Sequence, residues 1–425
     1  MFLAILGRQP KISLAELESI FGTNNITPLS TNLALVKTKT FNLSRLGGTI
    51  KAGQIIDQPL LTYLKDLPPG KITLGVSDYS PTATAKSSQQ QALKFKSVLK
   101  RHGRSVRIVP NNSSATLASA TSHHNQLGEK INHIEIIIYQ KYIALSIGTQ
   151  NITAYAKRDQ ARPARDTFVG MLPPKLSQIL INLATGPTTS GRLLDPFCGT
   201  GTILQEALLM GYSVYGTDLS EKMIAYSQKN LAWLASKRQG LGNSDNIFQG
   251  NENNFFVPSE REPRQARLSA LSSRRASLTD KKLVSCPAEN HCQNYPIPCL
   301  LEAGNAIDFK WQKPINFIAT ETYLGQPFSA PPSEIKLKEV QHTTQKIILG
   351  FLKNISSQIR KNTPLALAIP AWRRPDHTFS HLNIIDEIEK LGYNVHQFQH
   401  ATPSELLYHR ENQVVARQII VLRKI

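Results

Sequence analysis

Cysteine is scarce in this chain, with four residues in 425. That number is too small for a disulfide scaffold at this length. Cys286, Cys292 and Cys299 stand near His291, but five and six residues separate the cysteines, unlike the closely spaced pairs of zinc sites. We therefore expect no metal site.

Long apolar runs are also missing. No stretch of the sequence reaches the roughly 18–20 apolar residues that a membrane-spanning helix needs. The first eight residues, MFLAILGR, have neither a basic start nor a cleavage-like site, so they do not resemble a signal peptide. These observations predict a cytoplasmic protein with no membrane segment.

Acidic residues are few relative to basic ones. The chain has 30 Asp and Glu against 49 Lys and Arg, which gives a formal net charge of +19. The excess is concentrated between Lys86 and Asp166, where thirteen basic residues face four acidic ones, a local net charge of +9. Such a balance says nothing about fold, but it favours a polyanionic partner, because neutralising phosphates releases their counterions.

Strand and helix patterns alternate along the chain and divide it into four segments. We expect two small α+β units at 1–80 and 81–150, a connector and helix at 151–191, and a doubly wound α/β domain at 192–425. Ser13 and Glu16 have the spacing of a helix-capping box, and Gly22 is expected to end that helix. Residues 251–296 are polar and rich in arginine, which is typical of a disordered insertion.

The strongest motif is LLDPFCGTGT, over residues 193–202. A strand is expected to end at Asp195 and a helix to begin near Thr202. Gly199 and Gly201 let the backbone of the intervening turn approach a ligand closely. The free N–H groups at the start of the helix suit a negative group, such as the carboxylate of a ligand.

A second acidic residue completes this pattern. The strand expected at 213–217 is followed by Asp218, whose carboxylate can accept hydrogen bonds from both hydroxyls of a ribose. A dinucleotide-binding fold shares this logic, but the turn lacks the third glycine of the G-x-G-x-x-G motif. An ordinary tight turn in a sheet protein is the alternative.

The turn 195–202, preceded by Arg162–Asp166 and Gly170–Lys175, resembles motif I and the start of the catalytic domain in the THUMP-domain RNA methyltransferases. Residues 3–7, 13–18, 46–51 and 408–417 resemble the branch that forms N2-methylguanosine in tRNA, at position 10 in archaeal and eukaryotic members. The resemblance covers most of the chain outside 251–296.

This resemblance implies an α/β fold class: a Rossmann-type S-adenosylmethionine-dependent methyltransferase domain preceded by α+β ferredoxin-like and THUMP domains. It implies S-adenosylmethionine as cofactor and tRNA as partner; an accessory protein subunit is not readable from the sequence. The expected cofactor-binding residues are Asp195, Phe197, Gly199, Gly201, Thr202, Asp218 and Asn305. The expected RNA-binding residues are Lys94, Lys100, Arg101, Arg104 and Arg107.

The sequence departs from the family after the fourth strand. Members that methylate amines carry Asp-Pro-Pro-Tyr or Asn-Pro-Pro-Tyr there, whereas this chain has Thr320-Glu-Thr-Tyr323. Thr320 stands at the place of the acid, Glu321 is interpreted as a substitute hydrogen-bond acceptor, and Tyr323 keeps the base-stacking position. Three alternatives remain: that Glu321 is an ordinary strand-end acid, that the target is another RNA base, or that the chain is a catalytically weak RNA-binding protein.

Overall fold

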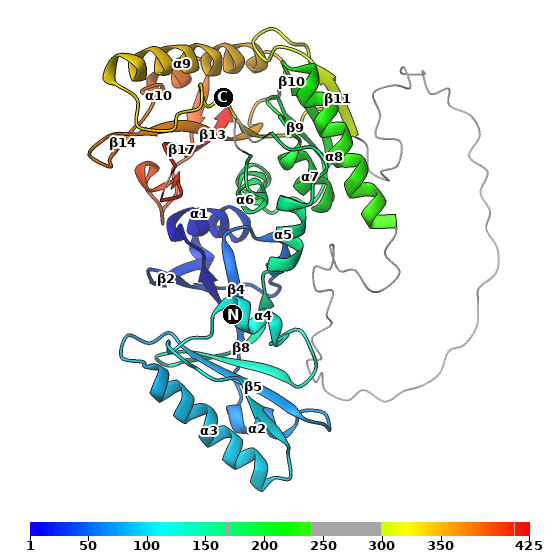
Figure 1. Cartoon of the computed structure of the whole chain (residues 1–425), viewed down its shortest axis with the longest axis vertical. Helices are drawn as coiled ribbons and strands as arrows, with labels where there is room; N and C mark the ends of the chain where they lie inside the picture. Colours follow the sequence, from blue (N-terminus) through cyan, green and yellow to red (C-terminus); the bar gives the residue numbers. More distant parts are fainter. Residues whose placement is uncertain (167–170, 240–298, 412) are drawn as a thin grey trace, which may run out of the picture.

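The computed structural model describes residues 1–166, 171–239, 299–411 and 413–425. The insertion expected at 251–296 lies outside the described residues, and so do Cys286, His291 and Cys292. The described elements build two sheets, which stand one above the other in Figure 1. Each sheet packs against its own helices.

The lower body in Figure 1 is an eight-stranded sheet that combines the two N-terminal segments. Its strand order is β2-β3-β1-β4-β8-β7-β5-β6, and the antiparallel pair β4–β8 joins the segments. The strands are β1 (Phe2–Leu6), β2 (Ile26–Ser30), β3 (Leu33–Val36), β4 (Thr49–Ile55), β5 (Ile72–Asp78), β6 (Val106–Ile108), β7 (His133–Tyr139) and β8 (Tyr142–Thr149). The helices are α1 (Pro10–Phe21), α2 (Leu60–Lys65), α3 (Ala85–Arg101) and α4 (Ser119–His124).

Two details of this body differ from the sequence analysis. Strand β5, expected in the first segment, pairs in parallel with β6 and β7 of the second. The capping-box prediction is wrong, because α1 begins at Pro10 and Ser13 lies inside the helix. Proline suits the first helical turn, where its missing N–H costs nothing. Gly22 does end the helix, as predicted.

The upper body is a nine-stranded sheet whose main path runs β11-β10-β9-β12-β13-β17-β15. Neighbouring strands from β11 to β13 are parallel, and β17 is antiparallel to both of its neighbours. The strands are β9 (Arg192–Asp195), β10 (Ser213–Asp218), β11 (Cys299–Ala303), β12 (Phe317–Glu321), β13 (Pro364–Arg373), β14 (Phe379–Ser380), β15 (Tyr393–Val395), β16 (Leu407–Tyr408) and β17 (Val415–Lys424). The strand order reverses between β9 and β12, which is where open α/β sheets bind ligands.

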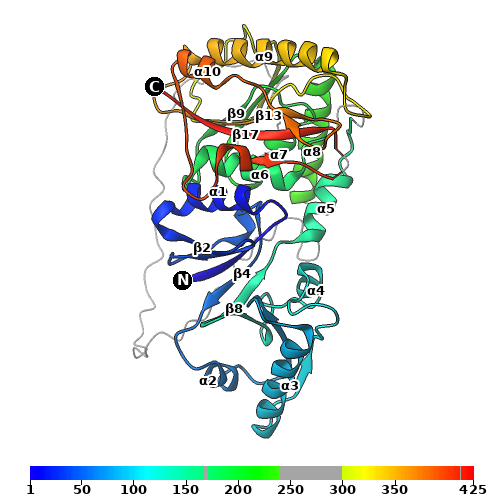
Figure 2. The same cartoon turned by 90° about the vertical axis from the view of Figure 1, so that its left-hand side faces the viewer.

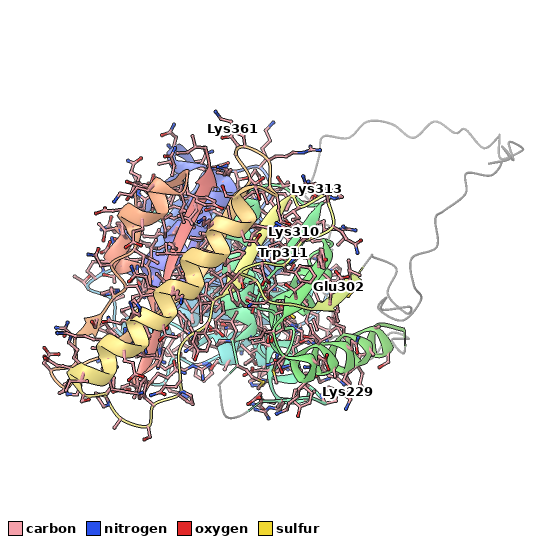
Figure 3. All side chains as sticks on the ribbon, turned by 90° about the horizontal axis from the view of Figure 1, so that it is seen from above. Lys229, Glu302, Lys310, Trp311, Lys313 and Lys361 are labelled. Atoms are coloured by element: carbon pink, nitrogen blue, oxygen red, sulfur yellow. The ribbon has the colours of Figure 1, made fainter. Side chains whose placement is uncertain are left out.

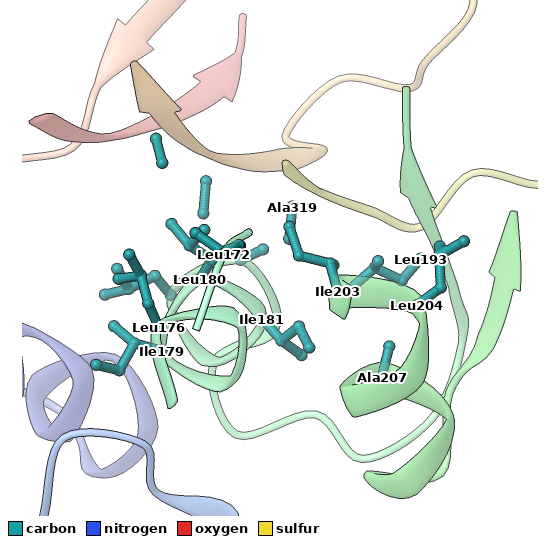
Figure 4. Close-up of a cluster of buried hydrophobic side chains, with 14 of the residues drawn as sticks. Leu172, Leu176, Ile179, Leu180, Ile181, Leu193, Ile203, Leu204, Ala207 and Ala319 are labelled. Atoms are coloured by element: carbon teal, nitrogen blue, oxygen red, sulfur yellow. The ribbon is translucent and has the colours of Figure 1, made fainter. Parts of the chain in front are cut away.

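Helices cover both faces of this sheet (Figure 2). One face packs against α6 (Pro174–Thr185), α7 (Thr202–Leu209) and α8 (Glu221–Gln239), and the other against α9 (Glu334–Ser356) and α10 (Ile385–Lys390). Side chains of strand β13 alternate between the two faces of the sheet. Ala366 and Ala368 point to α6, while Leu365 and Leu367 point to α9. The small side chains leave room for α6, whose leucines and isoleucines fill the core in Figure 4.

A polar junction joins the two bodies at α1 and α6. The buried Glu16 carboxylate accepts hydrogen bonds from the Gly47 and Gly48 N–H groups, both at 2.8 Å, and from Asn182 Nδ2 at 2.7 Å. Arg45 donates through Nε to Asn182 Oδ1 at 3.1 Å. Burial raises the pKa of Glu16 to about 7, against the lowering effect of these donors. Helix α5 (Ile152–Gln160) makes a second connection beside this junction.

Candidate cofactor and substrate site

The site is built on the turn between β9 and α7. Strand β9 ends at Asp195, Gly201 is the N-cap residue in left-handed conformation with φ 80°, and α7 begins at Thr202. Gly199 also has positive φ, 52°. This strand, glycine turn and helix start are as predicted. Both glycines occupy backbone conformations that residues with a Cβ adopt at a cost.

The two glycines have different surroundings. A Cβ at Gly201 would lie 2.8 Å from Ser227 Oγ, so this glycine permits close packing against α8. A Cβ at Gly199 would meet nothing within 4 Å, so this glycine borders open space. The Phe197 ring packs edge-on against Phe351 of α9, with centroids 5.4 Å apart. The turn therefore leaves bare backbone on its open side.

Asp218 stands at the end of β10, next to this turn. Its Oδ2 accepts from the Gly199 N–H and its Oδ1 from the Ser220 N–H, both at 2.9 Å. Burial raises the pKa of Asp218 above its ordinary value. Each oxygen keeps a further lone pair for a ligand hydroxyl.

The third strand adds Asn305, which is exposed just beyond the end of β11. The Gly304 N–H donates to the Asp218 carbonyl at 2.8 Å, which draws the two strand ends together. Leu219 lies beside them and is 74% exposed. The sequence analysis did not single out Leu219. The available signal was an apolar residue directly after Asp218, the acid at the end of β10.

Thr320 and Asp195 form a buried hydrogen bond between β12 and β9. Thr320 is fully buried, and its hydroxyl donates to Asp195 Oδ1 at 2.6 Å. Burial raises the pKa of Asp195 to about 8, with smaller raising contributions from the charges of Asp218 and Glu321. Thr320 was expected at the place of the catalytic acid, but its hydroxyl contacts Asp195.

Glu321 ends β12 and makes an ion pair that the sequence did not predict. Arg417 Nε of β17 donates to Glu321 Oε1 at 2.7 Å, and both side chains are largely buried. Tyr323 lies two residues further on and is 41% exposed. Thus the expected acceptor and the expected stacking residue are both near the carboxyl end of β12, the strand that pairs with β9.

The segment before the turn is tied to it by buried polar contacts. Arg158 Nε on α5 donates to Glu206 Oε1 on α7 at 2.7 Å, and both residues are buried. The Arg162 guanidinium donates to the Thr202 hydroxyl. Asn230 Nδ2 donates to the Thr200 carbonyl at 2.9 Å. Sequence reasoning assigned no role to these arginines, although it noted the motif that contains Arg162.

The expected RNA-binding residues lie far from this site, near the lower end of Figure 1. Lys94, Lys100 and Arg101 are exposed on α3. Arg104 has a structural contact instead, since it donates to the carbonyls of Leu67 at 2.7 Å and Pro68 at 2.6 Å. The fifth residue, Arg107, is exposed and donates to a neighbouring asparagine.

Other parts of the surface carry charge without belonging to the site. Lys313 and Lys361 precede β12 and β13, so they lie toward the edge where these strands begin (Figure 3). Within the described ranges, no helix is long and apolar enough to cross a membrane. In the same ranges, no three His, Cys, Asp or Glu side chains are grouped to hold a metal ion.

Comparison with known families matches residues 162–254 to the RMKL-like methyltransferase domain. That range contains β9, the glycine turn, α7 and β10, which are the parts of the site built around Asp195 and Asp218. The strand order and the antiparallel strand β17 on the main path of the upper sheet agree with a Rossmann-type methyltransferase fold.

Two curated relatives are tRNA (guanine(10)-N2)-dimethyltransferases. The protein from Methanothermobacter thermautotrophicus is 45% identical over 75 residues, which are 17% of this chain and 22% of the relative. The protein from Pyrococcus abyssi is 41% identical over 66 residues, 16% of this chain and 19% of the relative. The matched region therefore spans about a fifth of the length of each relative.

Two solved structures align with this chain at low identity. TrmN from Thermus thermophilus aligns over 100% of this chain and 99% of its own, with a TM-score of 0.43 and 13% identity. A putative RNA methyltransferase from Pyrococcus horikoshii aligns over 65% of this chain and 100% of its own, with a TM-score of 0.32 and 10% identity.

Proposed function

We propose that this protein is an S-adenosylmethionine-dependent methyltransferase that acts on the exocyclic amine of a guanine in tRNA. The observation that carries the proposal is the placement of the glycine turn, Asp218 and Glu321 along one edge of a single sheet. The local identity of 45% and 41% to two tRNA (guanine(10)-N2)-dimethyltransferases supports the same reaction.

The residues present fit the cofactor. The open space at Gly199 admits a ligand against bare backbone, and the Asp218 carboxylate is placed to accept from ribose hydroxyls. The Asn305 amide can accept from an adenine amino group. When bound, S-adenosylmethionine supplies a methyl group on a sulfonium; the new N–C bond forms as the S–C bond breaks, leaving a neutral thioether, and the amine releases a proton to water.

The protein's task on the substrate side is to orient a poor nucleophile. The lone pair of a guanine amine is delocalised into the ring, so an acceptor that binds the amine hydrogens both orients the nitrogen and raises its electron density. Glu321 is the carboxylate at the end of β12 that can serve as this acceptor. The exposed ring of Tyr323 can stack on the base, an interaction worth about 1–3 kcal/mol.

The RNA is held by the N-terminal body in this proposal. Lys94, Lys100 and Arg101 on α3 supply phosphate contacts, and we assign the RNA grip to the segment expected at 81–150. The segment expected at 1–80 connects that grip to α6 through the junction at Glu16. A protein that acts on tRNA is expected in the cytoplasm.

The decisive experiment incubates the full chain with unmodified tRNA and labelled S-adenosylmethionine and maps the product nucleoside by mass spectrometry. We expect N2-methylguanosine or its dimethyl form at one position. The Asp218→Ala variant is the control for cofactor-dependent labelling. A product on another base would overturn the guanine assignment and keep the methyltransferase.

A catalytically weak RNA-binding protein is the second candidate. It is favoured by the loss of both prolines after β12 and by the ion pair that occupies Glu321. Binding of tRNA and cofactor without any methylated product would establish this alternative.

A further inference from the structure

The ion pair between Glu321 and Arg417 lies on the face of the sheet that packs against α6. Side chains two residues apart on a strand share a face. Ala319 and Ile419 belong to the core cluster on the α6 face, and so does Leu193. Glu321, Arg417 and Asp195 are each two residues from one of these three, so they point to that same face. The pair therefore lies on the α6 face, and the charge of Glu321 contributes to the raised pKa of Asp195 at the end of β9.

The ion pair has a fixed geometry and is largely buried. Arg417 is fixed from two sides, because its Nε binds Glu321 Oε1 at 2.7 Å and its Nη1 donates to the Val415 carbonyl at 3.1 Å. The side chain of Arg417 is 6% exposed and that of Glu321 is 17% exposed. The planar guanidinium gives its partner a defined orientation. Glu321 is consequently a held carboxylate whose remaining exposure is at the strand end, where the base must arrive.

A carboxylate in a fixed orientation discriminates between purine bases. It accepts hydrogen bonds only, and its two oxygens offer about four lone-pair sites, so one bond to Arg417 leaves sites on both oxygens. The Watson–Crick edge of guanine presents two adjacent donors, N1–H and the N2 amine. Adenine and 2-aminopurine present a donor next to a lone pair, which a carboxylate repels. Acceptor-only chemistry therefore selects guanine among the purines.

We propose that Arg417 is a positioning residue that holds Glu321 as a paired acceptor for N1–H and N2–H of the target guanine, and that this pair sets the base specificity. The inference rests on the proposed function. The inference adds two features to that function: Arg417 on β17, and a hydrogen bond from N1–H of the guanine. N1 itself is not methylated.

The test compares two tRNAs that differ in one base. One carries guanosine at the mapped position and the other carries 2-aminopurine, which keeps the N2 amine but has a lone pair at N1. We expect the wild-type protein to methylate 2-aminopurine about 5- to 150-fold less efficiently in kcat/KM, the range for an unmatched buried polar contact. In Glu321→Gln, the amide offers one donor and one acceptor, so the preference for guanosine should shrink or reverse.

The role of Arg417 is tested by the same ratio, which is kcat/KM on guanosine divided by kcat/KM on 2-aminopurine. Arg417→Gln should lower kcat/KM on guanosine and reduce the preference over 2-aminopurine, whereas Arg417→Lys should restore part of both. The double variant with Glu321→Gln should lose little more than the worse single variant, because the two residues act as a unit. Arg373→Gln is the matched control: it removes a cation from the neighbouring end of β13, where Arg373 contacts the Glu411 carbonyl, and should leave the ratio unchanged.

Each outcome separates this inference from the proposed function. If the wild-type protein methylates guanosine but Glu321→Gln and Arg417→Gln keep the wild-type ratio, the inference is wrong and the proposed function stands. If Arg417→Gln loses only thermal stability, with an unchanged ratio, the pair is merely structural and the inference is again wrong. If the wild-type protein methylates no RNA, the proposed function fails and the inference fails with it.

Discussion

Replacing Asp195 by asparagine should remove a pH dependence from the stability of the protein. Burial raises the pKa of Asp195 from 3.8 to about 8. Between these values the carboxyl is protonated in the folded chain and ionised in the unfolded chain, so unfolding releases a proton. The contribution of Asp195 to stability is therefore complete below pH 4 and is lost as the pH rises through 8. The loss is about 1.4 kcal/mol per pH unit, or about 4 kcal/mol from pH 5 to pH 8.

The assay is urea unfolding of both proteins at several pH values between 5 and 8. Asparagine keeps an acceptor oxygen for the Thr320 hydroxyl, so the variant should fold, and the wild-type curve should fall relative to the variant as pH rises. Glu16→Gln is a useful comparison, because burial raises the pKa of Glu16 as well and its removal should change the pH dependence in the same direction. Parallel curves for wild type and Asp195→Asn would refute the reasoning.

Three further predictions concern the cofactor, the turn and the RNA. Asp218→Ala should weaken S-adenosylmethionine binding about 5- to 150-fold by calorimetry, the loss expected for about 1–3 kcal/mol of buried hydrogen bonding; unchanged affinity would remove Asp218 from the site. Gly201→Ala should lower the free energy of unfolding by about 1–3 kcal/mol, because φ is 80° and the new methyl would lie 2.8 Å from a serine hydroxyl; equal urea midpoints would contradict this. Replacing Lys94, Lys100 and Arg101 together by glutamine should weaken tRNA binding and flatten its dependence on log salt by about two to three units, and an unchanged slope would exclude α3 from the phosphate contacts.

The cofactor turn could be predicted because its information is local. Asp195, the two glycines and Thr202 lie within eight consecutive residues, and each has a conformational reason to be there. The end of the second strand was also visible, since Asp218 follows an apolar run. Short-range patterns of this kind fix a strand end and a helix start without knowledge of the rest of the fold.

The capping box failed for a related reason. Ser13 and Glu16 have the correct spacing, but their side chains are used by distant partners: Ser13 Oγ donates to the Gly48 carbonyl at 2.8 Å, and Glu16 binds the neighbouring N–H groups and Asn182. A tertiary contact thus outweighed the local motif. The pairing of β5 with β7 was equally hidden, because strands that are neighbours in a parallel sheet need a long crossover and are not neighbours in sequence.

The part of the site that we propose contacts the substrate base depends on residues that lie far apart in the sequence. Thr320 meets Asp195 across 125 positions and Glu321 meets Arg417 across 96, and neither meeting leaves a trace in sequence spacing. The sequence showed only that Thr320 stands at the place of the expected acid and that Glu321 follows it. The sheet order places β12 beside β9 and separates β12 from β17 by β13 alone, so Thr320 reaches the buried Asp195 carboxyl and Glu321 reaches the buried Arg417 guanidinium across β13. Of Thr320 and Glu321, the glutamate is the one that keeps a partly exposed carboxylate, so we propose it as the acceptor for the base and Arg417 as the residue that positions it.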